Sequence, residues 1–232
     1  MENRISECMS ILNRMRNLLL QVGSKSSTST TYQNDIAQYI LRNAEREEAI
    51  IEIGCFKGGL TAQLAFMAKV TASRLYTIDI DPTWVSHTEA LLQRFNLNTH
   101  TTYYRGTFDD FARTTIFTRK PLLLVIDGDH RYEAVIKDIQ SIYRLNQIPK
   151  AVAFHDFSLR YVEKFNTFVD RAIFDSFGQN IELIRIGQKI DDSPYMPKKS
   201  NPDPKEGFYW EEHGSEGVIL FPPEKLPLHA GV

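Results

Sequence analysis

Residues 122–135, LLLVIDGDHRYEAV, join an uninterrupted apolar run to a turn with two acids, a glycine and a histidine, and then to a helical pattern. A short apolar run bounded by a turn is typical of a strand buried on both faces, as in a parallel sheet. The turn carries Asp127, Asp129 and His130 at the carboxyl end of that strand. In open α/β sheets ligands bind outside the carboxyl ends of the strands, so this turn is the first candidate for a functional site.

Short apolar runs and helical patterns continue to alternate on both sides of this stretch. Seven strands are predicted, at residues 49–54, 75–79, 101–106, 122–127, 151–156, 181–186 and 217–221. Helical patterns lie at residues 60–70, 82–95, 131–146 and 160–177. The alternation predicts an α/β fold with a doubly wound, mostly parallel sheet. No helical pattern separates the last two strands, which are therefore predicted to form an antiparallel hairpin at the sheet edge.

The N-terminal region is predicted to be an appendage to this α/β domain. An amphipathic helix is indicated by apolar residues at a spacing of three or four, namely Ile5, Met9, Leu12, Met15 and Leu19. Residues 23–31, GSKSSTSTT, have the small polar composition of a mobile linker. We therefore expect residues 1–30 to be the helix and linker, and residues 31–232 to be the main domain. The helix could dock on its own domain, form a dimer contact or cover the active site.

Composition excludes several functional classes. The chain of 232 residues has 27 basic and 29 acidic residues, so it has no overall positive field to gather nucleic acid or an anionic membrane. The two cysteines, Cys8 and Cys55, have no metal-binding spacing and favour a reducing compartment. No apolar run has the length of a membrane span or the form of a signal peptide. We expect a cytoplasmic protein whose main partner is neither nucleic acid nor a membrane.

The turn after the first strand, EIGCFKGG at residues 52–59, is rich in glycine. Such a turn lets the backbone approach a ligand and presents the amides of a helix N-terminus. Its spacing differs from the dinucleotide and P-loop motifs, which counts against an NAD(P)-linked oxidoreductase. Asp79, at the end of the second strand, could accept hydrogen bonds from both ribose hydroxyls of a nucleoside. Tight packing between strand and helix would explain the glycines equally well.

Four motifs in this order, EIGCFKGG, LYTIDIDP, LLLVIDGDHRYEAVIKDI and AVAFHDF, resemble the class I S-adenosylmethionine-dependent methyltransferases over residues 45–160. They are most similar to the branch of macrocin O-methyltransferase and the cephalosporin hydroxylase-like proteins. The resemblance implies a Rossmann-like methyltransferase fold for residues 31–232 and S-adenosylmethionine as the cofactor. The cofactor contacts that it implies are Glu52, which would hold the methionine ammonium, and Gly54, Phe56, Gly58, Gly59, Asp79 and Asp127.

The resemblance also implies that Asp127 and Asp156 emerge side by side at the ends of the fourth and fifth strands. Two carboxylates there could hold Mg²⁺, which prefers oxygen ligands, and a bound hydroxyl would ionise more readily. His155 stands where some relatives have a second acid, and imidazole suits Mn²⁺, Fe²⁺ or Zn²⁺ better than Mg²⁺. The expected metal ligands are Asp127, His155 and Asp156, and the expected catalytic residues are Asp127, His130 and His155.

Two other roles for these side chains remain open. Without a metal, His155 or His130 could act directly as a general base, because histidine titrates near neutral pH. Alternatively, Asp129 or His130 only caps the following helix and His155 points into the core.

The expected reaction is transfer of a methyl group from S-adenosylmethionine to an oxygen of a small hydroxylated acceptor, such as a sugar or a natural-product intermediate. The alternatives are an NAD(P)-linked oxidoreductase and a non-catalytic, nucleoside-binding partner subunit. In a partner subunit of this kind, the N-terminal helix and the loop at residues 187–216 would be docking surfaces. The helix or the loop could also form a contact in a homo-oligomer.

Overall fold

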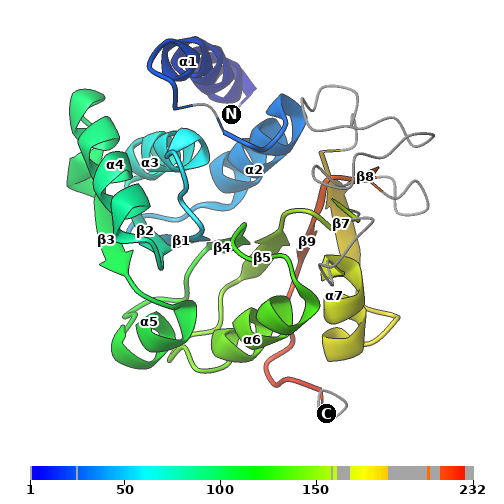
Figure 1. The fold of residues 1–232 in the computed structure, drawn as a ribbon. Coiled ribbons are helices and arrows are strands. Elements are labelled where there is room, and N and C mark those ends of the chain that lie inside the picture. Colours follow the sequence, from blue (N-terminus) through cyan, green and yellow to red (C-terminus); the bar gives the residue numbers. More distant parts are fainter. Residues whose placement is uncertain are drawn as a thin grey trace.

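The computed structural model describes residues 2–24, 26–157, 168–187 and 215–227, together with the backbone of residues 159–160 and 208–209. A central sheet is covered by helices on both faces (Figure 1). The helices are α1 (Glu2–Gln21), α2 (Thr30–Asn43), α3 (Gly59–Thr71), α4 (Pro82–Arg94), η1 (Asn98–His100), α5 (Phe108–Thr114), α6 (Tyr132–Ile142) and α7 (Val169–Phe177). The strands of the sheet are β1 (Ala49–Ile53), β2 (Arg74–Asp79), β3 (Thr101–Arg105), β4 (Leu123–Ile126), β5 (Ala151–Phe154), β7 (Leu183–Ile186) and β9 (Gly217–Leu220).

The seven strands lie in the order β3-β2-β1-β4-β5-β9-β7. All neighbours from β3 to β5 are parallel, whereas β9 runs antiparallel to both β5 and β7. The predicted doubly wound, mostly parallel sheet with an antiparallel hairpin at its edge is thus confirmed. The strand order reverses between β1 and β4, which is the point where ligands bind in such sheets.

The register aligns the ends of the strands that surround this point. Ile53 of β1 pairs with Ile126 of β4, and Ile126 pairs with Phe154 of β5. Because β9 is antiparallel, its beginning meets the end of β5, with Val218 opposite Phe154. The residues that follow β1, β4 and β5 and those that precede β9 therefore meet at one edge of the sheet.

The core lies on both faces of the sheet because the central strands are buried throughout and almost entirely apolar. Every residue of β1, β4, β5 and β9 is buried. One face packs against α2, α3 and α4, for example through Ile50, and the other packs against α5, α6 and α7, for example through Ile51 (Figure 1). Buried residues on alternate sides of β1 explain why its sequence reads as a continuous apolar run apart from Glu52.

Helix α1 docks on its own domain. Its buried face consists of Cys8, Leu12, Met15 and Leu19, which belong to the same core cluster as α2 and α3. The Arg16 guanidinium Nε donates to Gln33 Oε1 at 2.7 Å and to Gln63 Oε1 at 2.8 Å, linking α1 to α2 and α3. Within the described residues, no helix has the length and apolar content needed to cross a lipid bilayer.

Residues 26–29 are packed, although the composition of this segment predicts a mobile linker. Thr28 and Ser29 are buried, and Ser29 Oγ accepts a hydrogen bond from Tyr32 N at 3.1 Å as the N-cap of α2. The hydroxyl groups that suggest a solvated linker are used internally, which is why this expectation fails. The division of the chain at residue 30 stays a prediction.

Other differences concern the connections. The helical pattern at residues 160–177 predicts one helix, but α7 begins at Val169 and β6 (Leu159–Arg160) precedes it. Strand β6 pairs antiparallel with β8 (Phe208–Tyr209), and neither was expected. Most of the loop at 187–216 lies outside the described residues, and so do the docking and oligomer roles predicted for it.

Candidate active site

A cavity of about 790 Å³ opens at the carboxyl ends of the central strands. This volume lies within the range of sites for small molecules and cofactors. Among the residues with predicted roles, the cavity is lined by Gly54, Phe56, Asp79, Asp127, His130, His155 and Asp156. The structure therefore brings most of the predicted site residues together around one space.

The glycines of the first turn have packing roles. Gly54 has a φ of 88°, and a Cβ added there would lie 2.2 Å from the carbonyl oxygen of Asp127. Gly58 caps α3 with a φ of 75°, and its Cβ would lie 2.8 Å from Leu91. In the part of the chain that the structure describes, neither Gly58 nor Gly59 lines the cavity, whereas Gly54 and Phe56 do. The packing explanation that was left open for these glycines therefore applies, and their predicted contact with a cofactor stays a prediction.

Asp79 at the end of β2 is oriented by backbone amides. Its Oδ2 accepts from Cys55 N at 3.0 Å and from Phe56 N at 3.3 Å, and its Oδ1 accepts from Asp81 N at 2.9 Å. The Phe56 ring stands next to the ring of Trp84, with 4.8 Å between centroids, and both side chains line the cavity. A fixed carboxylate beside an aromatic wall is suited to a ribose and its base.

Glu52 is enclosed in the interior and is not among the residues that line the cavity, within the described chain. It alternates with Ile51 and Ile53 along β1, so its side chain points to the face covered by α3. The hydroxyl of Thr77 donates to its Oε2 at 2.8 Å, and burial raises its pKa to about 8. A carboxyl that is neutral near pH 7 and lies away from the cavity is poorly placed to hold an ammonium group. The predicted contact of Glu52 with the methionine ammonium therefore stays a prediction that this geometry does not favour.

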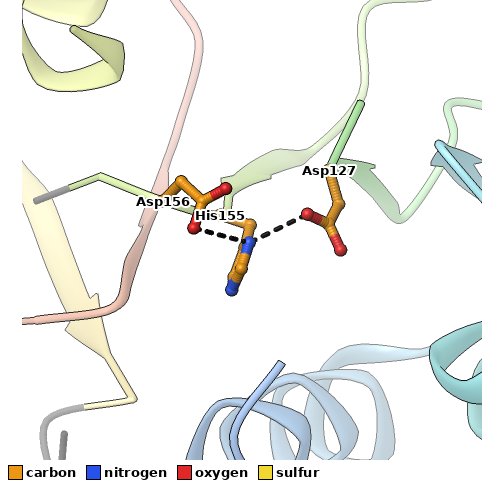
Figure 2. Close-up of side chains that lie close together, drawn as sticks. All are labelled: Asp127, His155 and Asp156. Carbon is orange, nitrogen blue, oxygen red and sulfur yellow. Dashed lines mark ion pairs between the residues drawn. The ribbon is translucent and has the colours of Figure 1, made fainter. Parts of the chain in front are cut away.

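Asp127, His155 and Asp156 form a compact group, here called the acid–histidine cluster (Figure 2). His155 Nδ1 lies 2.8 Å from Asp127 Oδ1 and 3.1 Å from Asp156 Oδ1. Asp127 follows β4 and the other two follow β5, so the predicted adjacency of the two strand ends is confirmed. The side chain of Asp127 is 14% exposed, against 4% for His155 and 9% for Asp156, so Asp127 is the most accessible of the three.

The second histidine of the site also contacts the cluster. His130 Nδ1 lies 2.9 Å from Asp156 Oδ2, and its side chain is 35% exposed. Asp156 has a φ of 56°, a left-handed conformation that costs a non-glycine residue about 1–3 kcal/mol. Its contacts with both histidines hold it there. Such strain is most common at functional sites, where the surrounding structure over-determines one geometry.

On its other side, His155 is held by a residue that the sequence did not indicate. Its Nε2 lies 2.9 Å from Oε1 of Glu216, which immediately precedes β9 and is fully buried. Ser29 donates to both carboxylate oxygens of Glu216, from its backbone N to Oε1 at 2.7 Å and from its hydroxyl to Oε2. The signal that could have located Glu216 is the antiparallel direction of the last strand, because an acid before that strand arrives where the parallel strands end.

The carboxylates govern the charge of the histidines. Burial opposes protonation of His155, but Asp127 and Asp156 outweigh it and raise the pKa of His155 well above its usual value. Burial likewise opposes ionisation of Asp156, yet His155 and His130 prevail and lower its pKa. For Asp127 burial outweighs the attraction of His155, so its pKa is raised. The pKa of His130 is raised for the same reason: burial lowers it, but Asp156 and Asp127 outweigh burial.

The donor set of the acid–histidine cluster suits a divalent cation. One ligand atom from each of Asp127, His155 and Asp156 lies within 4.8 Å of the others. Two carboxylate oxygens with one imidazole nitrogen match the preferences of Mn²⁺, Fe²⁺ or Zn²⁺ better than those of Mg²⁺. A bound cation would have to displace a proton from the imidazole, which makes binding dependent on pH.

Comparison with known proteins agrees with the fold. Residues 51–157 match a family model described as a methyltransferase domain. No curated protein matches the sequence.

Several solved structures are similar to this chain. Cofactor-bound Rv0187 from MTB has a TM-score of 0.57 at 15% identity, over 93% of this chain and 89% of that one. A second structure is the O-methyltransferase TomG from Streptomyces achromogenes, which is involved in tomaymycin synthesis and was solved with S-adenosylmethionine. Its TM-score is 0.56 at 14% identity, over 90% of this chain and 88% of that one. Geranyl diphosphate C-methyltransferase from Streptomyces coelicolor, solved with Mg²⁺, has a TM-score of 0.50 at 10% identity, over 80% of this chain and 74% of that one. This structural similarity shows a Rossmann-like methyltransferase fold, and the two named methyltransferases differ in whether they methylate oxygen or carbon.

Proposed function

We propose that this chain, whose matched domain and fold support a class I S-adenosylmethionine-dependent methyltransferase, transfers a methyl group to an oxygen of a small hydroxylated acceptor. The narrower resemblance to the macrocin O-methyltransferase branch is part of this proposal, and so is a sugar or natural-product intermediate as the acceptor. One observation carries it. The oriented carboxylate of Asp79 and the acid–histidine cluster face the same cavity of about 790 Å³.

The residues present fit S-adenosylmethionine. Asp79, held by the amides of Cys55 and Phe56, would accept hydrogen bonds from the ribose hydroxyls. Phe56 and Trp84 would cover the nucleoside from the side of α4. When bound, the cofactor supplies the methyl group. The protein orients the acceptor oxygen in line with that group, which accounts for much of the catalytic effect in a two-reactant transfer.

The acceptor must also lose a proton. In this proposal the base is His130, because it lines the cavity and its Nδ1 contacts Asp156, and a carboxylate at one ring nitrogen increases the basicity of the ring. Asp127, His155 and Asp156 would hold a divalent cation such as Mn²⁺, Fe²⁺ or Zn²⁺, with Mg²⁺ less favoured. A bound cation would make an acceptor hydroxyl more acidic.

Calorimetry with S-adenosylhomocysteine tests the cofactor site. Asp79→Asn should weaken binding about 10-fold or more, because it removes charge-assisted hydrogen bonds worth about 1.5–3 kcal/mol. Asp81→Asn is the matched control, since the side chain of Asp81 caps α4 by accepting from Thr83 N at 2.8 Å and the substitution leaves its backbone N–H in place. The affinity of this variant for S-adenosylhomocysteine should equal that of the wild type. Equal affinities in Asp79→Asn and the wild type would contradict this placement of the cofactor.

Turnover tests the acid–histidine cluster. Methyl transfer to a panel of hydroxylated small molecules is followed by mass spectrometry, and the methylated atom of each product is identified. Asp127→Asn should lower kcat about 100-fold or more with little change in cofactor affinity. Asp129→Asn is the control, because Asp129 pairs with Arg131 in the same turn. Transfer to carbon or nitrogen only, or unchanged turnover in Asp127→Asn, would refute the proposal.

A further inference from the structure

Glu216 is a buried carboxylate placed where three distant parts of the chain meet. It precedes β9, its Oε1 lies 2.9 Å from His155 Nε2 after β5, and both of its oxygens accept from Ser29 before α2. Its side chain has no exposed surface. Burying a carboxylate is costly unless its oxygens are fully hydrogen-bonded, and here three donors surround it.

We propose that Glu216 is the positioning residue of His155: by accepting a hydrogen bond from Nε2–H, it makes Nδ1 the nitrogen that faces Asp127 and Asp156 and that would bind a divalent cation. This inference rests on the metal-binding part of the proposed function. A histidine that binds a metal usually donates its other ring N–H to a carboxylate or carbonyl, which fixes both the tautomer and the orientation of the ring. The contacts of His155 have this arrangement, with Glu216 at Nε2 and the two aspartates at Nδ1.

Glu216 is tightly packed by the backbone and side chains around it. A Cβ added at Gly187 would lie 2.8 Å from Cβ and from Oε2 of Glu216, so only glycine fits at the end of β7. A Cβ at Gly217 would lie 2.5 Å from the ring of Tyr32. That ring in turn meets the His155 ring edge-on, with 5.0 Å between centroids. The imidazole is therefore held by a ring contact as well as by the carboxylate.

Ser29 fixes the orientation of Glu216. Its backbone N–H and hydroxyl both donate to the carboxylate, while its Oγ accepts from Tyr32 N at 3.1 Å, so the hydroxyl proton is directed to Glu216. The carboxylate also stands at the N-terminus of α2, where a negative charge is favoured. Oε1 accepts from Ser29 N and also from the third donor, His155 Nε2. These three groups all donate to the carboxylate, and a side-chain amide could not accept from all of them because its NH₂ group only donates.

Glu216→Gln is the test. The side-chain amide carries an NH₂ group that would meet either a donor of Ser29 or the N–H of His155. If it donates to Nε2, the imidazole proton moves to Nδ1, where it blocks a cation. Binding of Co²⁺, followed by its visible absorption and by calorimetry, should be about 10–100-fold weaker than in the wild type. Affinity for S-adenosylhomocysteine should not change.

Asp35→Asn is the matched control. Asp35 is a half-buried carboxylate of α2 that accepts from Gly187 N at 2.8 Å, close to Glu216, and within the described residues it makes no hydrogen bond or ion pair with His155. Its affinity for Co²⁺ should equal that of the wild type. An equal loss of Co²⁺ affinity in Asp35→Asn and Glu216→Gln would indicate a general effect of changing a carboxylate in this region, and would overturn the inference.

A measurement on the unmodified chain keeps the inference testable if Glu216→Gln does not fold. In ¹⁵N-labelled, Zn²⁺-loaded wild type, long-range ¹H–¹⁵N correlations should show Nε2 of His155 protonated and Nδ1 bound to the metal. Coordination through Nε2, or unchanged Co²⁺ affinity in Glu216→Gln, would overturn it. Binding of S-adenosylhomocysteine and methyl transfer without binding of Co²⁺ or Zn²⁺ would overturn this inference alone, whereas absence of cofactor binding would refute the proposed function.

Discussion

Gly54→Ala should destabilise the protein and disturb the site at the same time. The substitution places a Cβ 2.2 Å from the carbonyl oxygen and 2.7 Å from the carbonyl carbon of Asp127. Both are backbone atoms, so no flexible side chain can move away. The residue also has a φ of 88°, which costs a residue other than glycine about 1–2 kcal/mol. The clash adds about 1–3 kcal/mol of overpacking, so the total loss is about 2–5 kcal/mol.

Gly23→Ala separates the two causes. Gly23 has a φ of 75°, but a Cβ there has no neighbour within 4 Å, so this variant should lose only the conformational cost of about 1–2 kcal/mol. Urea unfolding followed by circular dichroism gives both free energies of unfolding, and their difference gives the cost of the clash. Gly54→Ala should also weaken S-adenosylhomocysteine binding, because relieving the clash moves the turn that carries Asp127. Equal losses of stability in the two variants would refute this account of the turn.

Two further predictions concern buried polar groups. The pKa of Glu52 rises from 4.5 to about 8 on folding, so folding binds a proton and the contribution of Glu52 to stability should fall between about pH 4.5 and 8. Glu52→Gln should therefore lose stability less steeply with pH than the wild type and be more stable at pH 7 by up to about 3 kcal/mol. Urea unfolding at pH 5 and 8 measures this, and an equal change between the two pH values in Glu52→Gln and the wild type would contradict it. Arg16→Ala leaves Gln33 and Gln63 without their donor and should cost about 1–3 kcal/mol in thermal unfolding, whereas the exposed Arg14→Ala should cost less than about 0.5 kcal/mol. Similar losses in the two arginine variants would show that the bridge contributes nothing.

The sheet could be predicted from the sequence because its buried strands have an unambiguous local pattern. Strands such as β4 are apolar at every position, and a parallel sheet requires this of strands buried on both faces. The acids and histidines that follow β4 and β5 could be placed for the same reason, since a parallel register brings equivalent ends together. The family resemblance added the strand order, which no local pattern contains.

Other features depend on contacts between residues far apart in the chain. Helix α2 was missed because the serines and threonines before it read as a linker, although Tyr32, Ile36 and Ile40 have the spacing of a buried helical face. Ser29 and Glu216 meet only because α2 and β9 both begin at the same edge of the sheet. Glu52 is the opposite case: its place in the motif suggests a ligand contact, whereas the alternation along β1 directs its side chain into the interior, and its contact with the cofactor stays a prediction.

The position of β9 has a consequence for the order in which this protein assembles during its synthesis. Strand β7 leaves the ribosome before β9, yet it cannot join the sheet until β9 has inserted between it and β5. Until residue 220 emerges, the nascent chain therefore presents the open, apolar edge of β5, a surface that invites pairing with other chains. Chaperone dependence should be greatest in that interval and should end when the last strand of the sheet enters.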